Sequence, residues 1–134
     1  MLGKVVLLVS ALVFIGYGLI SLIDPAVPAG LAGLVISNGN AYAEIGAMYG
    51  GLQTGIGIFC LLAVIRPDYY RGGLAVLAIG VGTLAAARLF SVLVNAEPVT
   101  FYSYGAFAYE ILTALLSVVA LRQAGMSADP SEQI

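Results

Sequence analysis

Four long apolar stretches dominate the chain and are separated by short segments that are richer in polar residues. A helix needs about 20 residues to cross the roughly 30 Å of hydrocarbon in a bilayer. Each stretch is long enough to do so. The pattern therefore predicts an all-α fold, a membrane-spanning four-helix bundle in a single domain over residues 1–126. The expected spans are residues 5–23, 44–65, 73–94 and 104–121, and a polar C-terminal tail follows over 127–134.

The first stretch has an alternative interpretation as a cleaved signal peptide. Its apolar run is long for the apolar part of a signal peptide, and Ala26-Val-Pro-Ala29 is a poor cleavage site. We therefore interpret it as the first span.

Basic residues predict the orientation of the spans. Those that flank the spans are Lys4, Arg66, Arg71 and Arg122, and with alternating helices they all fall on one side. The loops over 24–43 and 95–103 contain no Lys or Arg. Because cytoplasmic loops carry the excess of basic residues, we expect both termini in the cytoplasm, and the inner membrane of a bacterium as the location.

The first outer loop carries its own helix signal. Asp24-Pro25 resembles an N-cap followed by proline at the first helical position, and residues 29–36 are small and apolar. This pattern predicts a short helix lying at the outer membrane interface.

Glycines in the second apolar stretch form two pairs at four-residue spacing, Gly46 with Gly50 and Gly51 with Gly55. Such pairs let helix backbones approach closely in lipid. Because the pairs lie on two faces of the helix, they favour packing within the bundle over dimerisation. They predict that the second span is central and contacts the other three.

The two halves of the chain are weakly alike. Residues 19–24 and 89–95 each precede a proline-containing loop, and each loop leads into a helix with a Glu-Ile pair, at 44–45 and 110–111. This arrangement is typical of two repeated helical hairpins. The match is a few residues long, so chance similarity is the alternative.

Composition places the chain in a membrane. Hydrophobic residues make up 61% of it and charged residues 9%, whereas a soluble domain has about 25% charged residues. A domain of this size has too much surface to hide so many apolar side chains. The lipid bilayer is therefore an expected partner. The net charge of −2, with no basic patch, argues against nucleic-acid binding.

The chain has few of the side chains that usually bind metal ions. The chain has no histidine and one cysteine, Cys60, which lies in an apolar run. Histidine is the usual ligand of catalytic zinc and of haem, so we expect no metal and no cofactor.

Three ionisable residues lie inside the apolar stretches: Glu44, Arg88 and Glu110. Charges in lipid are costly, and they normally face the interior of a bundle with a partner. Helical rise places all three in the outer half of the membrane, with Arg88 between the two carboxylates in depth. We expect an Arg88–Glu110 ion pair with Glu44 as a second, weaker partner.

Neighbouring polar residues suggest more than a structural ion pair. Tyr17, Tyr49 and Gln53 lie on polar faces of the first two spans. Together with the three charges they form a candidate ligand-binding cluster. The alternative is a buried salt bridge that only fixes the register of the helices.

Sequence motifs add a resemblance. Glu44-Ile-Gly-Ala-Met-Tyr-Gly-Gly51, with Ala87-Arg-Leu89, Ser91 and the turn at Pro98, resembles the bacterial membrane proteins of domain-of-unknown-function family 4345. The likeness covers nearly the whole chain. Family members commonly have arginine where Gly46 stands, and glycine where Ala87 stands. The resemblance implies the fold and a bacterial origin, but no activity.

Three functions remain open at this point. The first is a bundle that binds a small amphipathic ligand or docks onto a larger membrane complex, and it demands least of the sequence. The second is an enzyme on a lipid-phase substrate, with Glu44 or Glu110 as general acid or base. The third is a small proton-coupled transporter. The oligomeric state stays undetermined.

Overall fold

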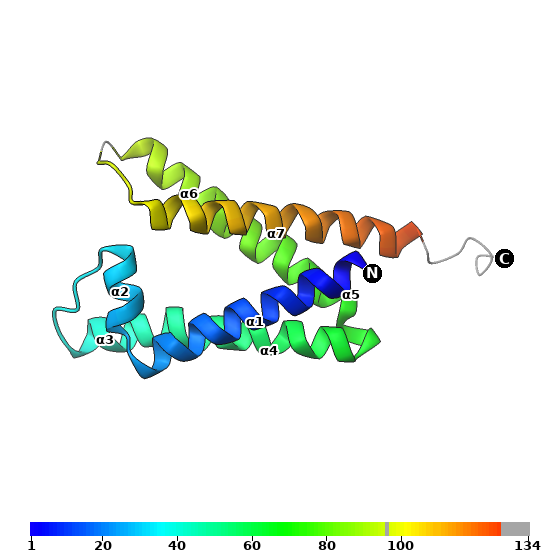
Figure 1. Cartoon of the computed structure of the whole chain (residues 1–134), viewed down its shortest axis with the longest axis horizontal. Coiled ribbons are helices and arrows are strands. Elements are labelled where there is room, and N and C mark those ends of the chain that lie inside the picture. The colour runs from blue at the N-terminus through cyan, green and yellow to red at the C-terminus, as the bar shows by residue number, and fades with distance from the viewer. Residues whose placement is uncertain (96, 127–134) are drawn as a thin grey trace.

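The computed structural model of the protein describes residues 1–95 and 97–126 (Figure 1). Within those residues every regular element is a helix. In chain order they are α1 (Leu2–Ile23), α2 (Ala26–Ala32), α3 (Gly39–Ile45), η1 (Gly46–Leu52), α4 (Gln53–Ile65), α5 (Pro67–Val76), η2 (Leu77–Val81), α6 (Gly82–Val94) and α7 (Phe101–Met126). The segments η1 and η2 are π-helical. The expected tail over 127–134 lies outside the described residues.

Four of the continuous helices are long and apolar enough to cross a membrane, which confirms the predicted all-α fold with four spans. They run over Leu2–Ile23, Gly39–Ile65, Pro67–Val94 and Phe101–Gly125. The second span thus consists of α3, η1 and α4, and the third consists of α5, η2 and α6. This is the architecture of a multi-pass membrane protein.

The second and third spans begin earlier than their apolar stretches. Asn38 caps α3, because its side-chain oxygen accepts hydrogen bonds from the backbone N–H groups of Asn40 and Ala41, both at 3.0 Å. Pro67 occupies the first position of α5, where its missing N–H costs nothing. Counting apolar residues finds only the part of a helix that lies in hydrocarbon, so these polar first turns were missed.

The predicted interfacial helix is present as α2, displaced toward the N-terminus. Asp24 accepts a hydrogen bond from the Ala26 N–H at 3.0 Å and starts the helix. Gly33 ends it with a φ of 70°, a left-handed conformation that glycine adopts without steric cost. The helix packs against α1 and the start of α7, with Pro28 and Ala29 buried.

The central helix is α1, and the prediction that the second span contacts all the others is wrong. α1 packs along the second span on one side and against α7 on the other. Among the described residues the second span has no extended contact with α6 or α7. Its packing partners are α1 and, at the turn through Pro67, α5.

The reason lies in which glycines face a neighbour. A Cβ added at Gly50 would lie 2.6 Å from the side chain of Leu22, and one at Gly57 would lie 2.7 Å from Ile15, both on α1. Gly51 and Gly55 face away from the protein, with no neighbour closer than 4.0 Å. One face of the second span is therefore used for close packing, where the glycine pairs suggested two.

The two ends of the molecule differ in how tightly they are closed. At one end lie the start of α1, the end of α7 and the turn from α4 to α5, and here α5 packs against both α4 and α7 (Figure 1). We call this the termini end. At the other, the α2 end, α6 diverges from the second span, and the two are far apart (Figure 1). The helices form two hairpins, α1 with the second span and the third span with α7.

Candidate functional site

Arg88 and Glu110 form a bidentate ion pair between α6 and α7. Arg88 Nε donates to Glu110 Oε2 at 2.9 Å, and Arg88 Nη2 donates to Oε1 at 2.6 Å. This confirms the pairing expected from the sequence. The side chain of Glu110 is 6% exposed and that of Arg88 is 25% exposed. The carboxylate is thus held inside the protein, while the guanidinium keeps one side open.

The helix face that carries Glu110 explains its burial. Thr113, Ala114 and Ser117 are also buried, and they lie three, four and seven residues further along α7. Ser117 satisfies its hydroxyl by donating to the Thr113 carbonyl at 2.8 Å. A carboxylate on this face loses contact with water, so it needs the two charge-assisted hydrogen bonds from Arg88.

Glu44 does not join the pair, contrary to expectation. Glu44 is exposed, and it forms no ion pair with any of the described residues. The second span is 27 residues long, which is roughly 40 Å and longer than the hydrocarbon core. Glu44 lies about 8 Å from its α2 end, near headgroup depth, where a carboxylate can reach water without a protein partner.

Tyr17 links α1 to α7 through a hydrogen bond with a second tyrosine. The hydroxyls of Tyr17 on α1 and Tyr102 on α7 lie 3.0 Å apart. Tyr109, seven residues after Tyr102, packs edge to face on Phe14 of α1, with ring centroids 6.3 Å apart. The seven-residue spacing of two tyrosines is the signal that would have placed Tyr102 toward the interior.

A cavity of about 360 Å³ lies beside the open face of Arg88. Its polar lining comes from three elements and the α6–α7 loop: Tyr49, Arg88, Ser91, Asn95 and Ser103. Its apolar lining is Leu84, Ala87, Val92 and Val99. Ser91 and Asn95 lie three and seven residues after Arg88, on the same side of the helix, and this side borders the cavity.

The π-helical segment η1 carries the one lining residue of the second span, Tyr49. A π-helical turn holds an extra residue and shifts the faces that follow it, and such segments are frequent at functional sites. Three glycines, Gly46, Gly50 and Gly51, lie in this segment. Gln53, one turn further, is partly buried but does not line the cavity.

The chemistry that the cavity offers is hydrogen-bond donation. A guanidinium carries five N–H groups in a fixed fork, and Glu110 accepts from two of its nitrogens. No other hydrogen bond of Arg88 is found within the described residues. The Ser91, Ser103 and Tyr49 hydroxyls and the Asn95 amide add further donors around the same space. Tyr49 and Tyr102 also lie within electrostatic range of the guanidinium.

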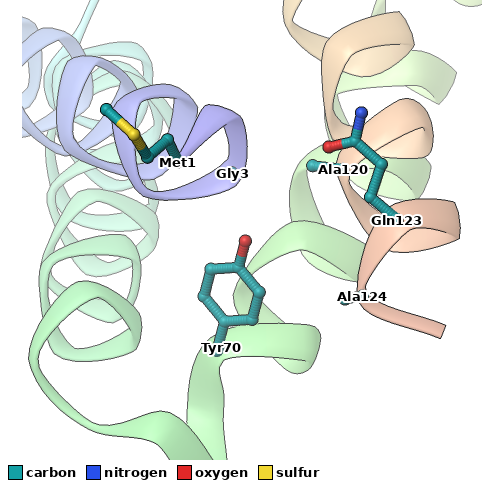
Figure 2. A pocket seen from close by; sticks show the side chains of 6 residues that line it. All are labelled: Met1, Gly3, Tyr70, Ala120, Gln123 and Ala124. Atoms are coloured by element: carbon teal, nitrogen blue, oxygen red, sulfur yellow. The ribbon is translucent and has the colours of Figure 1, made fainter. Parts of the chain in front are cut away.

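A second cavity, of about 320 Å³, lies at the termini end between α1, α5 and α7 (Figure 2). Its lining consists of Met1, Gly3, Tyr70, Ala120, Gln123 and Ala124, with no charged side chain. The Tyr70 ring points toward α1 (Figure 2), and its hydroxyl occupies the space that a Cβ on Gly3 would need. The Arg88 cavity is the stronger candidate for a functional site because, of the two cavities, it is the one lined by a charged side chain.

Comparison with known proteins identifies the family but no function. Comparisons with curated proteins and with solved structures find no match. A family model described as Domain of unknown function (DUF4345) matches residues 2–121, which is nearly all of the four spans. The chain is a member of this family of unknown function, as the resemblance of its Glu44–Gly51 segment implied.

Proposed function

We propose that the protein binds a small amphipathic ligand in the Arg88 cavity. The observation that carries this proposal is the half-open guanidinium: Glu110 holds one side of Arg88 in place, and the other side borders a polar cavity. An ion pair needed only for helix register would gain nothing from such a cavity. A positioned donor group with apolar walls around it is typical of ligand sites.

The catalytic alternative has less support from the geometry. General acid–base chemistry requires a carboxyl group within hydrogen-bond reach of the substrate. Glu110 is buried and held by Arg88, and Glu44 is exposed and does not line the cavity. Binding needs only the donors that already border the space.

We also propose that the α2 end faces away from the cytoplasm of a bacterial cell. The start of α1, the turn from α4 to α5 and the end of α7 lie together at the termini end (Figure 1), and these segments carry Lys4, Arg66, Arg71 and Arg122. Under the positive-inside rule that end is cytoplasmic. The Arg88 cavity then opens near the outer leaflet.

A cavity-filling pair of variants tests the binding proposal. Ala86 and Ala87 are both exposed, but only Ala87 lines the cavity. Native mass spectrometry after gentle extraction should find a bound small molecule on the wild type and on Ala86→Phe, but not on Ala87→Phe. Equal occupancy of the two variants would contradict the proposal, as would a wild type without any bound molecule.

A further inference from the structure

The side of the molecule between the second span and α6 is open in its α2 half. There is no extended contact between the second span and α6 in the described part of the chain, and Tyr49 is the second span's one contribution to the cavity wall. Figure 1 shows α6 running away from α3 toward the α2 end. In a membrane, this side of the cavity would face lipid.

The walls of the cavity change character with depth. Leu84, which is 44% exposed, lies roughly 6 Å deeper in the membrane than Arg88, one helical turn away on α6. Asn95 lies roughly 10 Å from Arg88 in the other direction, at the end of α6. A molecule seated here finds apolar wall on the membrane side and hydrogen-bond donors toward the surface, which matches the polarity of a lipid.

The charges at the α2 end bear on which kind of lipid headgroup the cavity would accept. Asp24, Glu44, Glu97 and Glu110 lie in this half of the molecule, with Arg88 as its one basic residue. Glu110 already neutralises Arg88 through two hydrogen bonds. An anionic headgroup would meet this excess negative charge, and a cationic headgroup would offer the N–H groups of Arg88 no lone pair to accept their hydrogen bonds. An uncharged group that accepts hydrogen bonds avoids both costs.

We propose that the ligand of the Arg88 cavity is an uncharged amphiphile whose headgroup accepts hydrogen bonds, such as an ester or a hydroxyl-rich group, and that it enters from the bilayer between the second span and α6. This inference rests on the proposed function and adds to it the class of ligand and its route. The headgroup lies against Arg88, Ser91 and Asn95, and the tail lies along Leu84.

The chain contains no tryptophan, so a single introduced tryptophan reports on the cavity by fluorescence. Leu84→Trp places it in the wall, and Leu112→Trp, at a 57% exposed position on α7 outside the lining, is the control. Val99→Trp is a second cavity reporter in case Leu84→Trp does not fold. Each variant is assembled into nanodiscs that contain either a monoacylglycerol or a lysophosphatidate, both with the same brominated acyl chain, which quenches tryptophan.

In these nanodiscs the monoacylglycerol should quench the fluorescence of Leu84→Trp saturably. Its half-saturating mole fraction should be at least about fivefold lower than that of the lysophosphatidate. Quenching of Leu112→Trp should rise with bulk lipid composition equally for both. Adding Asn95→Ala should raise the half-saturating mole fraction about fivefold, the effect of one lost hydrogen bond. The brominated amphiphile is supplied within the bilayer, which is where the proposed lateral route begins.

Two results overturn the inference. Tighter binding of the lysophosphatidate would show that the site selects an anion, and the proposed function would stand. Quenching of both cavity reporters that stays proportional to bulk composition would refute lateral binding of either amphiphile. In that case the occupancy difference between Ala86→Phe and Ala87→Phe decides separately whether the cavity binds any ligand.

Discussion

At the scale of single residues, depth in the membrane decides whether a charged side chain needs a partner within the protein. Arg88 lies roughly 9 Å from the end of α6 and Glu110 roughly 14 Å from the start of α7, so neither reaches bulk water easily. The two side chains form an ion pair with each other. Glu44 lies nearer the end of its span and remains exposed without a protein partner in the described region.

The ion pair should show strong energetic coupling. Arg88→Leu strands a buried carboxylate, whereas Arg88→Leu combined with Glu110→Leu leaves apolar groups in an apolar place. We expect the single variant to unfold more readily than the double variant, with a coupling free energy of about 0.5–3 kcal/mol. A double-mutant cycle on unfolding in bicelles measures it. Additive effects of the two changes would mean that the pair seen here does not hold α6 to α7.

The Tyr17–Tyr102 hydrogen bond should contribute to the packing of α1 on α7. Tyr17→Phe and Tyr102→Phe each remove the same bond between hydroxyls 3.0 Å apart. Each should lower the free energy of unfolding by about 1 kcal/mol, and the double variant should cost little more than either one. Tyr104→Phe, at a 59% exposed position on α7, is the matched control and should have no effect. Full additivity would argue against a shared bond.

At the scale of helices, close packing of α1 on the second span replaces the driving force that water gives to soluble helices. Gly18 of α1 packs on Thr54, and Gly50 and Gly57 of the second span pack on α1 in return. Backbones that approach this closely gain van der Waals contact along the whole interface. The lipid-facing glycines of the same helix have no such role.

Two neighbouring glycines of α4 therefore respond oppositely to the same change. Gly57→Leu forces a side chain into Ile15 and the α1 backbone, and it should lower stability by about 1–3 kcal/mol or more. Gly55→Leu points into lipid and should leave stability unchanged or raise it, because leucine favours a helix more than glycine does. Thermal unfolding in detergent, followed by circular dichroism, compares them. Similar losses for both would refute the assigned face.

At the scale of the whole molecule, the asymmetry between the two ends links fold to function. The termini end is closed by α5, and the α2 end is open toward lipid beside α6. Under the proposed function, an amphiphile reaches Arg88 through this opening without crossing water. Charge distribution follows the same axis, with four flanking basic residues and Asp68 at the termini end and Asp24, Glu44 and Glu97 in the α2 half.

Cysteine labelling should reveal the orientation in intact cells. Val35, 83% exposed in the loop after α2, and Asp68, in the first turn of α5, lie at opposite ends. With the α2 end outside, Val35→Cys should react with a membrane-impermeant maleimide and Asp68→Cys should react only after lysis. Wild-type Cys60 is fully buried and should not react in either case, which makes it the background control. The reverse pattern would invert the topology.

Much of this protein follows from its sequence because lipid constrains a chain strongly. Backbone groups must be satisfied within each span, so long apolar stretches become helices, and the four spans were predictable. The cost of a charge in lipid likewise predicted that Arg88 and Glu110 would find each other across α6 and α7. The bounds of the spans were less accurate, since Asn38 and Pro67 start helices with polar turns that an apolar count ignores.

What the sequence left undetermined depends on contacts between distant helices. The sequence does not distinguish Gly51 from Gly57. Only the packing of α1 shows that Gly57 faces Ile15, whereas Gly51 faces away from the protein. Glu44 was misplaced for the same reason, because the face and the depth of a helix have meaning only relative to its neighbours. The cavity beside Arg88 exists because α6 diverges from the second span. Crossing geometry of this kind is set by side-chain packing over the whole fold, so tertiary structure alone decided it.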